Sequence, residues 1–238
     1  MNIAIIGYGR MGHEIETIAR ERGHLIQLIV DKDNVSDLNK ENLGRVNVAI
    51  EFSSPATAFI NVSTCLNEGI PVVSGTTGWS NDIEKVKEIC LRKGTSFIHS
   101  TNFSIGVNIL FRLNAELARL AGSQNEYKVL IEEIHHTKKL DAPSGTAITL
   151  AGGIVENCNK YKGWTFENNQ TEGFVPVRSV REGMVPGTHI ISWESDSDII
   201  SIKHEAKNRK GFALGAVIAA EFVRNRKGVF TMSDVLGF

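Results

Sequence analysis

The stretch that determines the fold of this chain is Asn2-Ile3-Ala4-Ile5-Ile6-Gly7-Tyr8-Gly9-Arg10-Met11-Gly12. Its apolar first half stops abruptly at Gly7, which predicts a short, fully buried strand over Asn2–Ile6. Its second half opens a predicted helix over Arg10–Arg22, in which apolar residues recur at helical spacing until Gly23 ends the run. A glycine-rich turn between a buried strand and a helix is typical of a dinucleotide-binding fold.

The glycines of this turn form a complete G-x-G-x-x-G pattern. Gly7 makes the tight turn, Gly9 lets a pyrophosphate approach the backbone, and Gly12 lets the helix and the strand pack closely. The start of the helix offers unpaired N–H groups and the positive end of its dipole to the phosphates. The loop residues expected to contact the cofactor are Gly7, Tyr8, Gly9, Arg10, Met11 and Gly12.

The choice between NADH and NADPH depends on the residues after the second predicted strand, Leu25–Val30. Asp31 closes this strand and suits a carboxylate that accepts hydrogen bonds from a ribose diol. It favours NADH, because the 2′-phosphate of NADPH would meet its charge. Lys32, or Arg10 in the glycine loop, would offset that phosphate and admit NADPH. We therefore expect the protein to use NADH, NADPH or both.

Strand and helix alternate through the first part of the chain, which predicts a Rossmann-type parallel sheet with helices on both faces. The further elements predicted here are Val46–Phe52, Pro55–Glu68, Pro71–Ser74, Asp82–Arg92 and Ser96–His99. Ligands bind beyond the carboxyl ends of such strands, so the loops after them are candidates for binding the nicotinamide side of the cofactor. The candidates are Phe52, Gly75, Thr76, Thr77, Ser100, Thr101, Asn102 and Phe103. Ordinary helix capping by serine and threonine is the alternative interpretation.

After Ser104 the pattern changes to that of a second, α+β domain with a mixed or antiparallel sheet. The predicted helices and strands are Val107–Leu120, Tyr127–Ile134, Gly145–Asn157, Val175–Arg181, His189–Glu194 and Ile199–His204. Turn signals separate the last three strands, and those strands alternate apolar and polar residues as a sheet with one solvated face does. A final apolar helix, Phe212–Val223, is expected to pack back onto the first domain.

The most informative segment for chemistry spans residues 133–147, EIHHTKKLDAPSGTA, and leads from a strand into a helix. The helix start at Ser144, Gly145 and Thr146 is a ready site for a carboxylate, and Lys139 adds positive charge. Histidine supplies an acid or base that titrates near neutral pH. The segment therefore predicts a small anionic substrate that receives a proton as well as a hydride.

Other uses of these residues are less consistent with the sequence. His135 and His136 would suit a metal, but the acids nearby lie in the same strand, whose neighbouring side chains point to opposite faces, so no metal site is predicted. Ser144 lacks the G-x-S-x-G turn of a serine nucleophile and is interpreted as a helix cap. Lys138 is interpreted as a solvated charge.

Composition limits the classes of partner. The formal net charge of −1 over 238 residues gives no basic excess for nucleic acid. The N-terminus carries no signal-peptide pattern, and no apolar run reaches the length of a membrane span. Cys65, Cys90 and Cys158 form no paired motif, which indicates buried, reduced thiols. We expect a cytoplasmic protein without nucleic-acid or membrane partners.

Four motifs together resemble one enzyme family: GYGRMG, GTTG, STNFSIGVN and EIHHTKKLDAPSGTA, which begin at Gly7, Gly75, Ser100 and Glu133. They resemble the 4-hydroxy-tetrahydrodipicolinate reductase (dihydrodipicolinate reductase) family, and the resemblance covers essentially the whole chain. It implies NAD(P)H-dependent reduction of a small cyclic dicarboxylate in lysine and diaminopimelate biosynthesis. It also implies a homotetramer, a dinucleotide-binding domain of residues 1–105 plus 209–238, and a substrate-binding and oligomerisation domain of residues 106–208.

The resemblance also implies roles for individual residues. His135 matches the proton donor of the family, and Lys139 matches a second acid/base group or a partner for a carboxylate. His136, Gly145 and Thr146 match substrate contacts, and Ser144 stands beside them. Two alternatives stay open: a Rossmann reductase for another imino- or keto-acid, and a non-catalytic NAD(H)-binding sensor. A sensor has no need of a proton donor beside an anion site, which argues against it.

Overall fold

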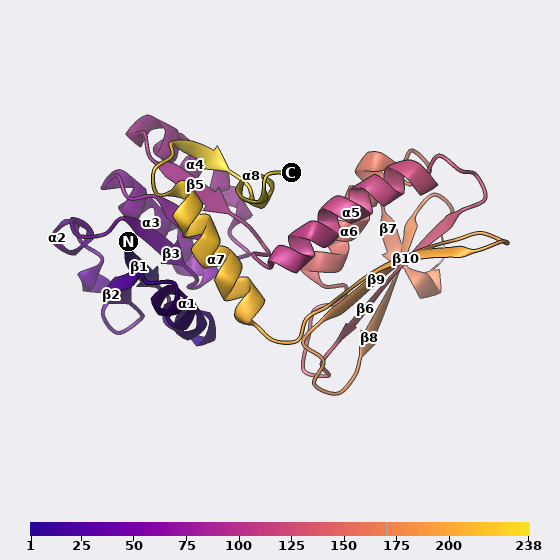
Figure 1. Ribbon diagram of the computed structural model, residues 1–238, viewed down its shortest axis with the longest axis horizontal. Coiled ribbons are helices and arrows are strands. Elements are labelled where there is room, and N and C mark those ends of the chain that lie inside the picture. The colour runs from indigo at the N-terminus through magenta and orange to yellow at the C-terminus, as the bar shows by residue number, and fades with distance from the viewer. Residues whose placement is uncertain (170) are drawn as a thin grey trace. The chain divides into compact units, whose positions relative to one another are not determined.

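The chain forms two units in its computed structural model, which describes residues 1–169 and 171–238. The first unit consists of Met1–Ile105 together with Arg209–Phe238, and the second unit consists of Gly106–Asn208. In Figure 1 the colours follow the chain from the indigo first unit through the second unit and back to the first in yellow. The C-terminal residues are therefore part of the same unit as the N-terminal strand.

The sheet of the first unit has six parallel strands in the order β11-β5-β4-β3-β1-β2. Its strands are β1 (Asn2–Ile6), β2 (Leu25–Val30), β3 (Val48–Glu51), β4 (Val72–Ser74), β5 (Ser96–His99) and β11 (Gly228–Phe230). The chain places β2 on one side of β1 and β3 on the other, so the strand order reverses at β1. This confirms the predicted Rossmann-type sheet, and such a reversal is where these sheets bind ligands.

Helices cover both faces of this sheet because the side chains of each buried strand alternate between two apolar cores. In β1, Ile3 and Ile5 enter the core shared with α1 and α7, whereas Ala4 and Ile6 enter the core shared with α3 and α4. The helices of this unit are α1 (Arg10–Glu21), η1 (Val35–Asp37), α2 (Lys40–Leu43), α3 (Pro55–Asn67), η2 (Ser80–Asp82), α4 (Ile83–Lys93), α7 (Lys210–Val223) and α8 (Met232–Leu236).

The helix α7 packs against α1 and the sheet of the first unit, as expected from its apolar sequence. The approach is close, since a Cβ on Gly215 would lie 1.7 Å from the carbonyl oxygen of Phe103. After α7 the chain adds β11 to the edge of the sheet, beside β5. Neither β11 nor α8 was predicted, because elements of three and five residues carry little periodicity.

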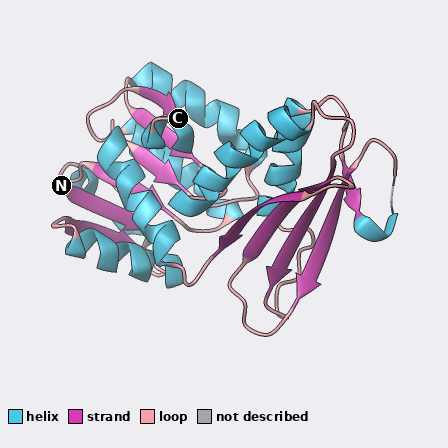
Figure 2. Cartoon of the chain, turned by 45° about the vertical axis from the view of Figure 1, so that its right-hand side comes forward, coloured by secondary structure: helices cyan, strands magenta, loops and turns pink. Residues whose placement is uncertain are grey.

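The second unit has a mixed sheet of five strands in the order β10-β9-β6-β8-β7. β6 and β7 each pair with β8 in parallel, whereas β9 pairs antiparallel with both β6 and β10. Figure 2 shows the two long helices of this unit beside its strands. The elements are α5 (Ile105–Ala121), β6 (Lys128–His135), α6 (Gly145–Asn157), β7 (Trp164–Phe166), η3 (Glu167–Asn169), β8 (Val175–Arg181), β9 (Thr188–Glu194) and β10 (Ile199–Glu205).

One face of this sheet forms the core of the second unit with α5 and α6. Leu110 of α5 and Leu150 of α6 belong to the same buried cluster as Val129 and Ile131 of β6. Along β6 every second residue is buried, from Val129 to His135. Since side chains two residues apart share a face of a strand, Glu133 and His135 point to the side that the helices cover.

Within the described residues, no helix is long and apolar enough to cross a membrane. Cys65, Cys90 and Cys158 are free and buried. Burial, together with the nearby carboxylate of Glu51, raises the pKa of Cys65 to about 12, so this thiol stays protonated and unreactive.

Candidate active site

Two cavities lie along the loops that follow the strands of the first unit. One, of about 490 Å³, is lined by loops after β1, β3 and β4, and the other, of about 350 Å³, by loops after β1, β2 and β3. The predicted cofactor residues on the first are Gly9, Arg10, Met11, Phe52, Gly75, Thr76 and Thr77. Those on the second are Gly7, Gly9, Asp31, Lys32 and Phe52. The two cavities share Gly9, Phe52 and Ser53, so they adjoin at the point where the strand order reverses.

Arg209 also lines the first cavity, although it was not predicted as a site residue. It is the N-cap residue of α7, far along the chain from the glycine loop. Together with Arg10 it brings two guanidinium groups to a cavity beside the start of α1. Two cations and a helix N-terminus suit the two negative charges of a pyrophosphate.

Some predicted cofactor residues have other surroundings. Among the described residues, Tyr8, Gly12 and the loop Ser100–Phe103 line neither of these two cavities. Gly12 serves close packing, because a Cβ there would lie 2.5 Å from the carbonyl oxygen of Gly7. Within the loop, Ser100 Oγ donates a hydrogen bond of 2.8 Å to the carbonyl oxygen of Asn102.

Two glycines, Gly7 and Gly75, lie so close to Phe52 that no larger residue would fit at either position. A Cβ on Gly7, whose φ is 90°, would lie 2.1 Å from the carbonyl oxygen of Phe52. A Cβ on Gly75 would lie 2.1 Å from Cε1 of the same phenylalanine. By contrast, a Cβ on Gly9 would meet nothing within 4 Å. The glycines at 7 and 75 therefore hold the loops together, and Gly9 leaves its side open for a ligand.

A buried carboxylate, Glu51, organises the loops of the first cavity. It is fully buried at the end of β3 and accepts hydrogen bonds from Ser53, Ser74 and Thr76. The backbone N–H of Ser53 also donates to Thr76 Oγ1 at 2.8 Å. Glu51 was not predicted as a site residue, although an acid that ends an otherwise apolar strand is a visible signal.

The start of α6 is an exposed helix N-terminus in the second unit. Ser144 caps it as predicted, since its Oγ accepts the N–H of Ala147 at 3.2 Å. Gly145 is exposed, and a Cβ there would meet nothing within 4 Å, whereas Thr146 is half-buried. A helix start with open space beside its first residues is suited to an anion such as a carboxylate.

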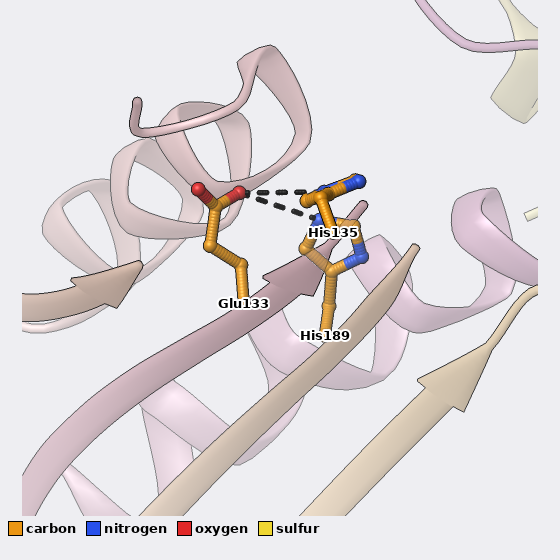
Figure 3. Close-up of side chains that lie close together, drawn as sticks. All are labelled: Glu133, His135 and His189. Atoms are coloured by element: carbon orange, nitrogen blue, oxygen red, sulfur yellow. Dashed lines mark ion pairs between the residues drawn. The ribbon is translucent and has the colours of Figure 1, made fainter. Parts of the chain in front are cut away.

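Three ionisable side chains gather beside this helix start (Figure 3). Glu133 and His135 come from β6 and His189 from β9, and all three are buried. Glu133 Oε2 lies 3.5 Å from His135 Nε2 and 3.9 Å from His189 Nε2. The backbone N–H of Ser144 lies 3.1 Å and 3.0 Å from the two oxygens of Glu133. The same carboxylate therefore contacts the predicted proton donor and the predicted anion site.

Burial and neighbouring groups shift the pKa values of Glu133 and His189. Burial raises the pKa of Glu133, but the polar groups of His135, Ser144 and Ser179 beside it lower the pKa by more, so the carboxylate is ionised. Arg181 of β8 neutralises it, with 3.0 Å between its Nη2 and Glu133 Oε1. Burial is the main cause that lowers the pKa of His189 to about 4, so this histidine is neutral at neutral pH.

The remaining predicted substrate residues lie in the loop after β6. Lys139 is half-buried and donates to Asp141 Oδ2 at 2.8 Å, whereas Lys138 is exposed. The N–H of His136 donates to the carbonyl oxygen of Val185 at 2.9 Å, which ties this loop to the β8–β9 connection. Lys139 is therefore placed by an acid neighbour, and Lys138 has the solvated position expected of it.

The same three side chains are the group in the described chain that most resembles a metal site, because their ligand atoms lie within 4.8 Å of one another. Adjacent residues of the strand point to opposite faces, as expected, whereas Glu133 and His135 are two apart and share a face. The charges argue against a cation here. Arg181 already neutralises Glu133, and the N–H of Ser144 occupies both of its oxygens.

Comparison with protein families matches both parts of the chain. The profile described as "Dihydrodipicolinate reductase, N-terminus" matches residues 1–103, and "Dihydrodipicolinate reductase, C-terminus" matches residues 106–236. The chain is 51% identical over 237 residues to the 4-hydroxy-tetrahydrodipicolinate reductase of Christiangramia forsetii, covering 99% of this chain and 98% of that protein. It is 34% identical over 238 residues to the protein of that name from Thermosipho africanus, covering 99% and 98%.

Solved structures share the fold. A dipicolinate-bound dihydrodipicolinate reductase from Paenisporosarcina sp. TG-14 has a TM-score of 0.81 and 23% identity, and 97% of each chain is covered. A probable dehydrogenase from Thermotoga maritima has a TM-score of 0.61 and 11% identity, with 99% of this chain and 92% of that chain covered. At these identities the likeness concerns the fold, a Rossmann-type unit followed by an α+β unit.

Proposed function

Since this chain belongs to the dihydrodipicolinate reductase family, we propose that its first unit binds NAD(P)H, that its second unit binds the substrate, and that His135 donates the proton. The chain is an NAD(P)H-dependent oxidoreductase of lysine and diaminopimelate biosynthesis, and it reduces 4-hydroxy-tetrahydrodipicolinate. The observation that carries the proposal is that Glu133 contacts both His135 and the start of α6. A proton donor thus stands beside a site for an anion.

The adjoining cavities of the first unit support binding of a dinucleotide. We assign the pyrophosphate to the start of α1, with Arg10 and Arg209 as its cations. Asp31 accepts hydrogen bonds from the adenosine ribose, and the exposed Lys32 beside it is available to a 2′-phosphate. Both NADH and NADPH are therefore substrates in this proposal. The bound cofactor supplies the hydride.

A ring with two carboxylates fits the charges of the second unit. One carboxylate accepts hydrogen bonds from the start of α6, at Ser144, Gly145 and Thr146. Lys139 pairs with the other carboxylate, and His136 in the same loop contacts the ring. The dihydrodipicolinate reductase from Paenisporosarcina was solved with dipicolinate, a flat dicarboxylate of this kind.

Proton transfer is the task of His135. Hydride addition leaves negative charge on the ring, and the protonated imidazole of His135 neutralises it by donating its proton. General acid catalysis of this kind contributes about 10²–10⁴-fold to the rate. His189 does not compete as a donor, because its pKa of about 4 keeps it neutral at neutral pH. Lys139 assists by holding the ring through its carboxylate.

The sheet of the second unit supports our proposal that the protein assembles into a homotetramer. Its face away from α5 and α6 carries Leu130, Ile134 and Ile190, which are only half-buried, and Ile199 on the edge strand β10 is 60% exposed. We assign this face to contacts with further copies of the chain. Light scattering during size-exclusion chromatography tests the assignment, with four times the 26.1 kDa of one chain as the expected mass and a monomer as the contrary result.

The decisive experiment is a cofactor-oxidation assay coupled to dihydrodipicolinate synthase, which supplies the substrate, run separately with NADH and NADPH. We expect turnover with each cofactor, and a large loss of kcat in His135→Ala with unchanged cofactor affinity. Cofactor binding without turnover would instead identify a sensor. Turnover only with other imino- or keto-acids in a substrate panel would identify a different reductase.

A further inference from the structure

We propose that Glu133 is a positioning residue of the proton transfer, which fixes His135 and the start of α6 in one arrangement and supplies the negative charge that a protonated His135 requires. The inference rests on the proposed function, because it concerns how His135 donates its proton. It adds a residue that acts through its neighbours rather than on the substrate.

The register of the sheet brings the members of this cluster together from three strands. Glu133 of β6 stands directly opposite His189 of β9, and His135 stands directly beside Arg181 of β8. Glu133 has no exposed surface, and it is the one of these residues whose side chain contacts each of the others. A carboxylate in this place therefore controls the position of the whole cluster.

Each contact of Glu133 constrains a different part of the site. The N–H of Ser144 donates to both of its oxygens, which holds the first turn of α6 against the end of β6. On the other side Oε2 faces Nε2 of His135 at 3.5 Å. The histidine ring has little freedom to move away, because a Cβ on Gly187 would lie only 2.9 Å from its Cε1. The donor ring and the anion site are thus positioned relative to one carboxylate.

The charges of the cluster suit a histidine, His135, that binds and releases a proton. Arg181 pairs with one oxygen of Glu133, Oε1, the other oxygen, Oε2, faces His135, and His189 is neutral at neutral pH. A proton on His135 would then be a single buried positive charge beside a carboxylate, which a low-dielectric site tolerates far better than an unpaired cation. The charged or titratable groups that face the imidazole or its neighbours are Glu133, Lys139, Arg181, His189 and His204.

The test uses Glu133→Gln, which keeps the shape of the side chain and removes its charge. The amide would present an N–H to His135 Nε2, which favours the unprotonated imidazole. We expect kcat to fall about tenfold to a hundredfold and the alkaline limb of its pH profile to move to lower pH. The matched control is Glu132→Gln, the adjacent acid of β6, which pairs with Arg178 on the other face and should leave kcat and the profile unchanged.

A double variant separates positioning from general damage to the fold. If Glu133 acts through His135, Glu133→Gln should cost less than about threefold in a His135→Gln background, because effects on one catalytic unit are not additive. An equal cost in both backgrounds would overturn the proposal. Wild-type turnover in His135→Gln itself would instead overturn the assigned proton donor. If His135→Gln loses activity while Glu133→Gln keeps normal activity, the proposed role of Glu133 is wrong and His135 remains the proton donor.

If Glu133→Gln does not fold, the variant Arg181→Gln provides a second test of the proposal. Removal of the guanidinium leaves the carboxylate uncompensated, so the protonated imidazole is favoured and the alkaline limb should move to higher pH, opposite to Glu133→Gln. An unmoved limb would contradict the proposal. Loss of wild-type turnover after treatment with a metal chelator, restored by a divalent ion, would also overturn it, because Glu133, His135 and His189 would then be metal ligands.

Discussion

Thr76 Oγ1 lies 2.7 Å from Glu51 Oε1 and fastens the loop after β4 to the end of β3. Ser74 Oγ donates to the other oxygen of this carboxylate at 2.6 Å, and Ser53 donates through both its backbone N–H and its hydroxyl. Because Glu51 is fully buried, these donors replace the water that a carboxylate would otherwise bind. The positions of the loops after β3 and β4, which belong to the proposed cofactor site, therefore depend on the carboxylate of Glu51.

Glu51→Gln is predicted to weaken cofactor binding. Its amide brings N–H groups to a place where every neighbour is a donor, so at least one hydrogen bond is lost and the loops after β3 and β4 separate. A loss of about 1.4 kcal/mol corresponds to about tenfold in Kd. Titration of the protein with NADH, followed by fluorescence, measures this change. Glu88→Gln, an exposed acid on α4, is the control, and an unchanged Kd in Glu51→Gln would contradict the argument.

Alanine at the loop glycines separates cofactor binding from folding. A Cβ on Gly12 would lie 2.5 Å from the carbonyl oxygen of Gly7, so Gly12→Ala should lower the Tm by several degrees. A Cβ on Gly9 meets no protein atom within 4 Å, so Gly9→Ala should keep the wild-type Tm. It should nevertheless raise the Kd for NADH about tenfold or more, because it fills the approach of the pyrophosphate. If Gly9→Ala bound cofactor normally, the pyrophosphate would lie elsewhere.

Five strands of the parallel sheet were predictable because they are short, mostly apolar runs that each end at or just before a glycine, serine or acid. Boundaries were less certain: the strand expected over Val46–Phe52 spans Val48–Glu51, since Phe52 already belongs to the loop. The strands β7 and β11 were missed because three residues show no alternation. In addition, β11 pairs with β5, a distant part of the chain, and local sequence does not encode such a contact, whereas β7 pairs with β8, which follows it closely.

The candidate site was predictable where its residues are contiguous. His135, Lys139 and the helix start at Ser144 stand in one segment, and a helix cap has a local signature. Arg181 and His189 come from separate strands and join Glu133 only through sheet register. No spacing rule connects these positions, so the cluster became visible only in the structure.

Lys139→Ala is predicted to raise the KM for the substrate about tenfold, because it removes a cation from a carboxylate of the substrate. Its kcat should fall less than that of His135→Ala. Lys138→Ala is the matched control: this neighbouring lysine is exposed and should show wild-type kinetics. Steady-state kinetics at saturating cofactor measures each value. Equal effects at the two lysines would mean that the loop contributes only a general positive field.

Substitution of two cations should separate binding of the pyrophosphate from binding of the 2′-phosphate. Arg209→Gln removes a cation from the cavity beside α1, so it should raise the KM for NADH and for NADPH alike. Lys32→Gln removes a cation beside Asp31 and should raise the KM for NADPH alone. A tenfold effect corresponds to about 1.4 kcal/mol. If Arg209→Gln raised the KM for NADPH only, Arg209 would instead bind the 2′-phosphate.

The buried histidine His189 predicts how the stability of the protein depends on pH. Burial lowers the pKa of His189 most, and the charge of His135 lowers it further, from the ordinary 6.5 to about 4. Between pH 6.5 and pH 4, His189 binds a proton in the unfolded chain but not in the folded protein. Stability is therefore lost as the pH falls from about 6.5 to about 4. His99 and His204, whose pKa values burial also lowers, act in the same direction.

His189→Gln should remove the contribution of this residue and leave that of the other histidines. For a pKa of about 4, His189 alone accounts for about 2 kcal/mol of the stability lost between pH 7 and pH 5. Urea unfolding of both proteins at the two pH values measures the difference. The variant should lose about 2 kcal/mol less than the wild type, even if it is less stable at pH 7. Equal losses would show that His189 takes up its proton in the folded protein as readily as in the unfolded chain.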